Sequence, residues 1–128
     1  MPKEIHKKYK SSENLQKSGT EKPEEIVHAL LSGLNKQLNS TLIEIKDGNQ
    51  SKAKKSAEKA QRIAYALQTA LDHKDGGRIA EDLEYLYSHI RFATERFIND
   101  NKTQFMDSAA FVSSEILDGW KGMAAKVA

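Results

Sequence analysis

Histidines are the residues of this chain with the widest chemical repertoire, because imidazole both ligates metals and carries protons near neutral pH. The four histidines are His6, His28, His73 and His89. No histidine or carboxylate follows any of them at the three- or four-residue spacing that a metal site on one helix requires. The chain also has no cysteine, which excludes disulfides and thiolate ligands. We therefore expect solvated surface histidines and no bound metal.

The glycine pair Gly76-Gly77 is the second candidate for chemistry. It does not form a phosphate-binding loop, because the Gly-x-x-x-x-Gly-Lys-Ser/Thr spacing is missing and no strand precedes it. A tight turn that requires a positive φ explains the pair better. The serines lie on polar faces or in loops, so no nucleophile is paired with a base. We accordingly predict no catalytic residue, no cofactor and no enzyme activity.

Apolar residues recur at helical spacing in four stretches, and no alternating strand pattern appears. The first stretch begins at Pro23, where proline suits the first turn of a helix, and ends at about Lys46, before Asp47-Gly48-Asn49-Gln50. Ser51 is the expected cap of the second, which runs to about Leu71. The third follows the break at residues 72–77 and ends at Asn99-Asp100-Asn101, and the fourth covers about residues 103–125.

The apolar positions of each stretch form one stripe, which is the side expected to face a core. These positions are Val27, Leu30, Leu31, Leu34, Leu38, Leu42 and Ile45; Ala53, Ala57, Ala60, Ile63, Ala64, Leu67, Ala70 and Leu71; Ile79, Leu83, Leu86, Tyr87, Ile90, Ala93 and Phe97; and Phe105, Ala109, Val112, Ile116, Trp120 and Met123. The alanine-rich second stripe permits close helix approach. Four helices joined by short turns predict an all-α, antiparallel up-down-up-down four-helix bundle.

Positive charge is concentrated in residues 1–22, which hold six lysines and three acidic residues. This segment lacks helical periodicity, so we predict a flexible N-terminal arm over residues 1–22 and a bundle domain over residues 23–128. The bundle domain holds 14 basic and 15 acidic residues, so we expect no concentrated basic stripe on it and no nucleic-acid partner. No apolar run approaches the roughly 18–20 residues that span a bilayer, which predicts no membrane insertion and a cytoplasmic location.

Several large apolar side chains fall opposite the core stripe of their own helix. They are Ile43, Tyr65, Tyr85, Phe92 and Phe111. Tyr85 and Phe92 are seven residues apart and therefore share an outer face, with His89 between them. Three interpretations remain: scattered surface residues, a wider core, or grooves that receive a partner's amphipathic helices. The same residues also fit a structural, scaffolding bundle that self-associates, so both a monomer and a weak homodimer remain open.

Residues 71–87 resemble the most specific segment of the flagellin export chaperone family (FliS-type). Their sequence, LDHKDGGRIAEDLEYLY, is similar to the family's L-D-x-x-x-G-G-x-I-A-x-N-L-x-x-L-Y segment, with Asp82 in place of the usual asparagine. Further similarities lie at Lys59-Ala60-Gln61-Arg62-Ile63, Lys22-Pro23-Glu24-Glu25-Ile26-Val27, Gly33, Trp120 and Tyr9. Leu31 and Ser32 depart from the family's usual Tyr-Asp, and Lys22 departs from its usual serine.

The resemblance implies a cytoplasmic chaperone that binds the C-terminal segment of newly made flagellin, blocks premature polymerisation and delivers the subunit to a flagellar export gate component. It also implies an arm that folds over the bundle and moves aside for the client, with Tyr9 and Ile5 as its apolar contacts. A merely disordered tail is the alternative for this arm. We predict as partner-binding residues Tyr9, Ile43, Tyr65, Tyr85, Phe92 and Phe111; the last five are chosen from their outward faces and not from the family.

Overall fold

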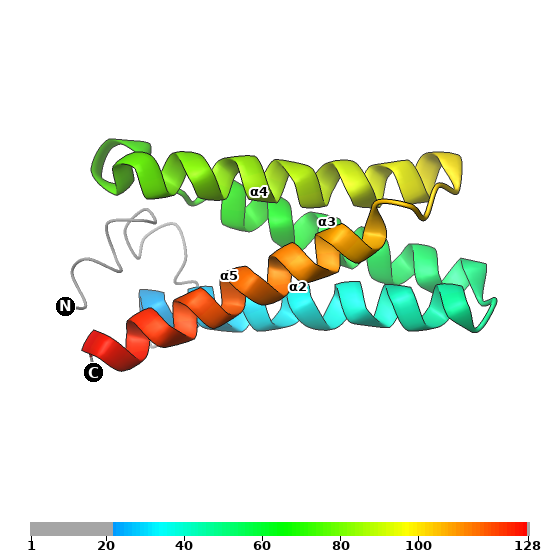
Figure 1. The fold of residues 1–128 in the computed structure, drawn as a ribbon, viewed down its shortest axis with the longest axis horizontal. Coiled ribbons are helices and arrows are strands. Elements are labelled where there is room, and N and C mark those ends of the chain that lie inside the picture. Colours follow the sequence, from blue (N-terminus) through cyan, green and yellow to red (C-terminus); the bar gives the residue numbers. More distant parts are fainter. Residues whose placement is uncertain (1–21, 128) are drawn as a thin grey trace.

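The computed structural model describes the backbone of residues 22–127 and the side chains as far as Lys121. Four helices make up this part of the chain (Figure 1): α2 (Pro23–Lys46), α3 (Gln50–Thr69), α4 (His73–Asp100) and α5 (Met106–Val127). Residues 22–127 contain no strand, so the predicted all-α class is confirmed. Residues 1–21, and with them Tyr9 and nearly all of the predicted arm, lie outside the described residues.

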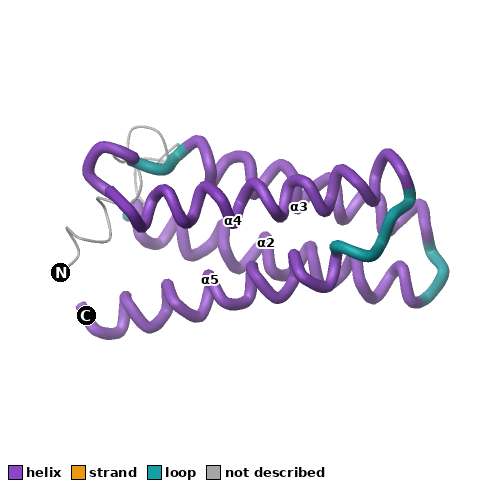
Figure 2. Tube along the Cα trace, turned by 45° about the horizontal axis from the view of Figure 1, so that its top comes forward, coloured by secondary structure: helices purple, strands orange, loops and turns teal. Residues whose placement is uncertain are grey.

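The four helices form an antiparallel up-down-up-down bundle, as the sequence predicts (Figures 1 and 2). Helices α2 and α4 each pack against both α3 and α5, so α3 and α5 lie diagonally opposite each other. The α2–α3 pair is the most extensive of the four contacts and the α4–α5 pair the least extensive. Helix α5 diverges from α4 toward the end of the bundle at which α4 begins (Figures 1 and 2).

Local sequence explains where α2 and α3 begin. Helix α2 has proline in its first turn, and two glutamates follow it where the positive end of the helix dipole lies. Helix α3 is capped by Asn49, whose side-chain oxygen accepts a hydrogen bond from the backbone N–H of Lys52 at 3.2 Å. The prediction of Ser51 as the cap is therefore wrong. Ser51 lies inside the first turn of α3, because the helix already begins at Gln50. The backbone N–H of Lys52, which is free at the start of the helix, is satisfied by Asn49.

Helix α4 begins earlier than predicted. Asp72 caps it by accepting a hydrogen bond from the backbone N–H of Asp75 at 3.0 Å, so residues 73–76 form a helical turn instead of a loop. The helix is then interrupted at Gly77, which has φ 55° and ψ −134°. The predicted positive φ is confirmed at this second glycine of the pair. It lies in a backbone region that is almost restricted to glycine.

Replacing Gly77 by alanine is expected to destabilise the bundle by about 1–3 kcal/mol, because a Cβ atom is strained at this φ and ψ. Gly119 is the matched control. A Cβ atom built there meets no heavy atom within 4 Å, so Gly119→Ala is expected to raise the stability of helix α5 by about 0.5–1 kcal/mol. Urea denaturation of the two variants measures both changes. Equal effects of the two substitutions would contradict the role of the kink.

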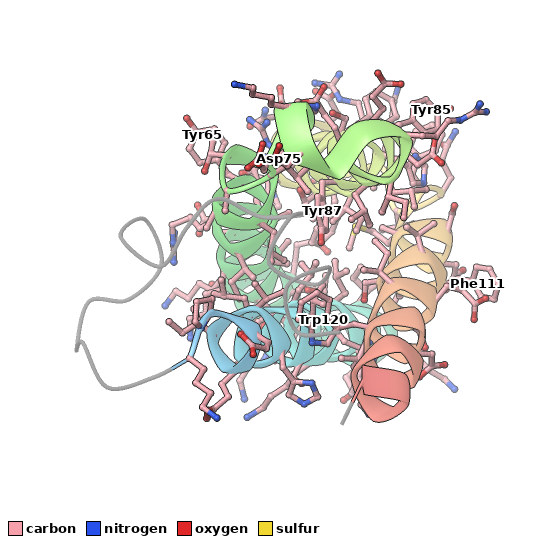
Figure 3. All side chains as sticks on the ribbon, turned by 90° about the vertical axis from the view of Figure 1, so that its left-hand side faces the viewer. Tyr65, Asp75, Tyr85, Tyr87, Phe111 and Trp120 are labelled. Carbon is pink, nitrogen blue, oxygen red and sulfur yellow. The ribbon has the colours of Figure 1, made fainter. Side chains whose placement is uncertain are left out.

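The core contains most of the predicted inward residues. The four alanines of the predicted α3 stripe, Ala53, Ala57, Ala60 and Ala64, are buried, which allows the close α2–α3 approach. Tyr87 and Phe97 are the largest fully buried side chains of the core. Figure 3 shows Tyr87 and Trp120 inside the bundle, between the helices. Ile79 corrects the prediction: it is 45% exposed although it lies on the predicted stripe of α4. It follows the kink near the start of α4, which is the end of the bundle at which α5 diverges from α4 (Figures 1 and 2).

Candidate partner-binding site

The five outward apolar residues are exposed, as the sequence predicts. Tyr85 is 75% exposed, Phe111 65% and Ile43 60%, while Tyr65 and Phe92 are about half exposed. Burial of such side chains on binding removes apolar surface from water, which is the main favourable term in protein association. Their exposure is confirmed, and their role in binding stays a prediction.

Tyr85 and Phe92 lie on the side of α4 that faces α5. Phe92 contacts Phe105, which precedes α5, with the ring centroids 5.0 Å apart and the ring planes inclined by 60°. Figure 3 shows Tyr85 and Phe111 on this same side of the bundle. We call Tyr85, Phe92, Phe105 and Phe111 the α4–α5 aromatic face. It combines two strongly exposed rings with a ring pair that the fold holds in place.

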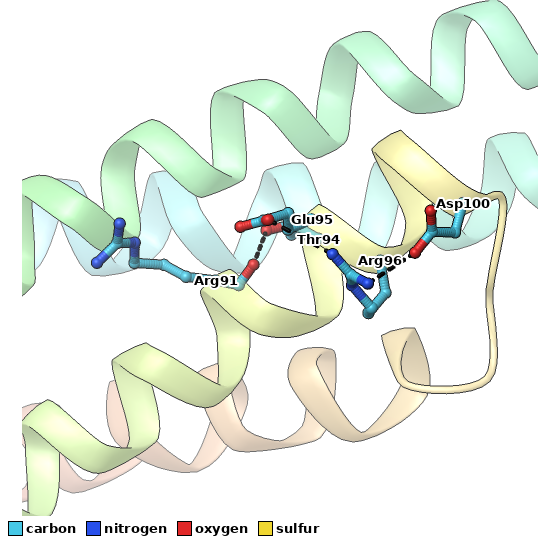
Figure 4. Close-up of polar contacts among 5 residues, drawn as sticks. All are labelled: Arg91, Thr94, Glu95, Arg96 and Asp100. Carbon is cyan, nitrogen blue, oxygen red and sulfur yellow. Dashed lines mark hydrogen bonds and ion pairs between the residues drawn. The ribbon is translucent and has the colours of Figure 1, made fainter.

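Polar contacts position the rings of this face. His89 lies between Tyr85 and Phe92, and its Nε2 atom is 2.9 Å from Ser108 Oγ of α5. Arg96 lies over the ring of Phe92 at 5.8 Å from the ring centroid. Its guanidinium pairs with Asp100 at 2.7 Å and with Glu95 at 3.5 Å (Figure 4). The part of the aromatic face that Phe92 and Phe105 form is therefore held in place before any partner binds, which reduces the entropy cost of association.

Tyr65 belongs to a different side of the molecule. It lies on α3, and Figure 3 places it across α4 from Tyr85. The guanidinium of Arg91 lies 4.8 Å from the centroid of its ring. Ile43 is exposed on α2. The structure thus brings Tyr85, Phe92 and Phe111 to one side and leaves Tyr65 and Ile43 on other helices. Tyr9 lies outside the described residues.

Sequence reasoning missed one member of the exposed apolar surface. Ile79 is on the predicted core stripe of α4 but is 45% exposed. Phe105 is partly buried and packs against the core, as its place on the predicted stripe implies, and it also contacts the half-exposed ring of Phe92. No signal in the sequence reveals the exposure of Ile79, because periodicity does not show where a neighbouring helix diverges.

The charge of the bundle is distributed unevenly among its helices. Helix α3 carries five basic residues and one acidic residue, so the expectation that the folded part has no concentrated basic stripe is wrong for this helix. The expectation failed because it rests on the summed charge of residues 23–128, in which acidic residues of the other helices balance the basic residues of α3.

Among residues 22–121, no three histidine or acidic side chains are close enough to hold a metal ion together.

The described residues thus form an all-α four-helix bundle with a packed core and with large apolar side chains exposed on several outer faces. The model of one protein family, described as flagellar protein FliS, matches residues 5–127. The chain therefore belongs to the FliS family, a family of flagellar chaperones. No curated protein sequence matches the chain. Within the described helices, none is long and apolar enough to cross a membrane.

Proposed function

We propose that this protein is a cytoplasmic export chaperone that binds the C-terminal segment of flagellin. Binding would block premature polymerisation and escort the subunit to a flagellar export gate component. The observation that carries the proposal is the α4–α5 aromatic face on a chain of the FliS family. The face is apolar, preformed in part and lies between two helices, which suits an amphipathic client segment.

The distribution of exposed residues supports a client that wraps around the bundle. A segment that is disordered when free must become ordered on binding, and this entropy cost lowers the net affinity for each unit of buried area. Such a client needs apolar contacts on more than one face. Tyr65 and Ile43 offer these additional contacts on α3 and α2. In the same proposal, residues 1–22 act as an arm that the client displaces, with Tyr9 as one of its contacts.

Self-association through the same aromatic residues is the competing function, and a measurement of mass separates the two. By light scattering, the chain alone is expected at its own mass of 14.4 kDa, and an equimolar mixture with flagellin at the mass of a 1:1 complex. Flagellin from which the C-terminal segment has been removed is the matched control and is expected to give no complex. A homodimer that forms at rising concentration and does not bind flagellin would favour the scaffolding function instead.

A further inference from the structure

A row of cations runs along the outer face of α3. Lys52, Lys55, Lys59 and Arg62 follow one another at spacings of three, four and three residues, which places them on one side of a helix. All four side chains are exposed. At 1.5 Å per residue the row is about 15 Å long. We call these four residues the α3 basic stripe.

The α3 basic stripe has no acidic partner in the part of the chain that the structure describes. None of its four side chains forms an ion pair there, whereas Arg96 pairs with both Asp100 and Glu95, and His73 with Glu84. Glu58 is the one acidic residue of α3; it lies three residues after Lys55 and four before Arg62, and it is not within ion-pair distance of either. Like charges three or four residues apart on a helix repel each other and weaken the helix slightly. The stripe is therefore a concentrated positive surface that is complementary in charge to an anionic ligand.

The stripe ends in a cavity between α3 and α4. Arg62 lines this open cavity of about 510 Å³ together with Gln61, Tyr65 and Arg91. Arg91 extends from α4 toward α3, away from the Arg96–Asp100 pair (Figure 4). The cavity thus presents two guanidinium groups, neither of which is paired with a carboxylate in the described residues.

Arg91 is held in a fixed position. Its Nη1 atom donates a hydrogen bond to Gln68 Oε1 at 2.8 Å, and Gln68 Nε2 donates to Ser88 Oγ at 2.9 Å. The guanidinium also stacks on the ring of Tyr65. Its Nε atom is buried, so an external ligand cannot reach that atom. A positioned guanidinium is suited to bind a carboxylate through its outer N–H groups.

We propose that the α3 basic stripe and the Arg62–Arg91 cavity together bind a short acidic segment of a protein partner. The charge of the rest of the domain selects this class of ligand: outside the stripe, residues 23–128 hold ten basic and fifteen acidic residues. Nucleic acids and anionic membranes extend far beyond 15 Å and would meet this negative surface, whereas a short acidic peptide neutralises the stripe alone. The lysines of the stripe lie on α3, diagonally opposite α5, and so away from the α4–α5 aromatic face, while the cavity shares Tyr65 with the additional client contacts proposed above.

A pair of synthetic fluorescent peptides tests the proposal. One carries glutamates at spacings of three, four and three residues, and its twin carries glutamines at the same positions. Fluorescence anisotropy is expected to show binding of the glutamate peptide that weakens as salt rises, and no binding of the glutamine twin. Equal binding of the two peptides would overturn the proposal.

Charge-matched variants separate a defined site from general attraction. The triple variant Lys52→Gln, Lys55→Gln, Lys59→Gln is expected to weaken the glutamate peptide at least tenfold. The control Lys22→Gln, Lys74→Gln, Lys121→Gln removes the same charge from exposed positions elsewhere and is expected to change binding less than twofold. A similar loss in both variants would overturn the proposal.

Two further ligands test the class of partner. A single-stranded oligonucleotide and vesicles containing phosphatidylserine are expected to bind more weakly than the glutamate peptide. Tighter binding of either one through the same three lysines would overturn the assignment to a protein segment. The triple variant is also expected to bind the flagellin C-terminal segment as the unaltered protein does, so that failure of this site and failure of the proposed function remain distinguishable.

Discussion

Replacing Tyr85 and Phe92 together by serine is expected to weaken binding of the flagellin C-terminal segment by roughly 30-fold or more, which corresponds to about 2 kcal/mol. Tyr85 is the most exposed of the large apolar side chains, and Phe92 lies seven residues further along the same face of α4, against Phe105. Aromatic residues of this kind contribute most of the energy in many protein interfaces. Isothermal titration of the double variant with the segment measures the loss.

Two controls accompany the double variant. Tyr85→Phe keeps the ring and is expected to bind nearly as the unaltered protein does. Thermal unfolding of the double variant is expected to remain cooperative, because Tyr85 is exposed and Phe92 is about half exposed. Loss of the folded state in the double variant would show that these residues belong to the core. A folded double variant with unchanged affinity would remove the α4–α5 aromatic face from the binding site.

Phe97→Ala is expected to produce the largest loss of stability, about 3–5 kcal/mol, because the ring is completely buried and its removal leaves a cavity in the core. A bundle of this size has a total unfolding free energy of about 5–15 kcal/mol, so this loss is a large fraction of it. Urea denaturation measures the change as a shift of the midpoint at constant slope.

Phe111 offers a control of the same residue type. It is 65% exposed, so Phe111→Ala is expected to change the unfolding free energy by no more than about 0.5 kcal/mol. The contrast between the two alanine variants tests the division of aromatic residues into inner and outer sets. Similar losses of stability from both substitutions would mean that the Phe111 side chain is buried in the folded protein. The assignment of Phe111 to the α4–α5 aromatic face would then be wrong.

The bounds and the buried sides of the helices were largely predictable, because they depend on residues close together in the sequence. Proline and two glutamates at one end and Asp47-Gly48 at the other gave the bounds of α2 as the structure has them, Pro23–Lys46. Alanine spacing identified the buried side of α3. The residue that caps the N-terminus of α3 was not predictable from nearby residues. Asn49 and Ser51 both have suitable side chains, and only the backbone geometry selects the first.

Features that depend on tertiary packing escaped sequence reasoning. Thr41 and Ser113 are buried polar residues, and their hydroxyls are satisfied by the carbonyl oxygen of Gln37 at 2.7 Å and by the side-chain amide of Asn35 at 3.0 Å. An apolar pattern cannot reveal such positions. The position of the Arg91 guanidinium likewise depends on a contact between helices, since Gln68 of α3 accepts its hydrogen bond and in turn donates one to Ser88 of α4.

The central claim is that this FliS-family bundle binds the C-terminal segment of flagellin. Its most direct test is an isothermal titration of the protein with a synthetic peptide of its own organism's flagellin C-terminus, followed by circular dichroism of the mixture. We predict a 1:1 complex with a helical signal larger than the sum of the two components, because the peptide becomes ordered on binding. No heat of binding and no added helical signal at roughly tens of micromolar would contradict the claim.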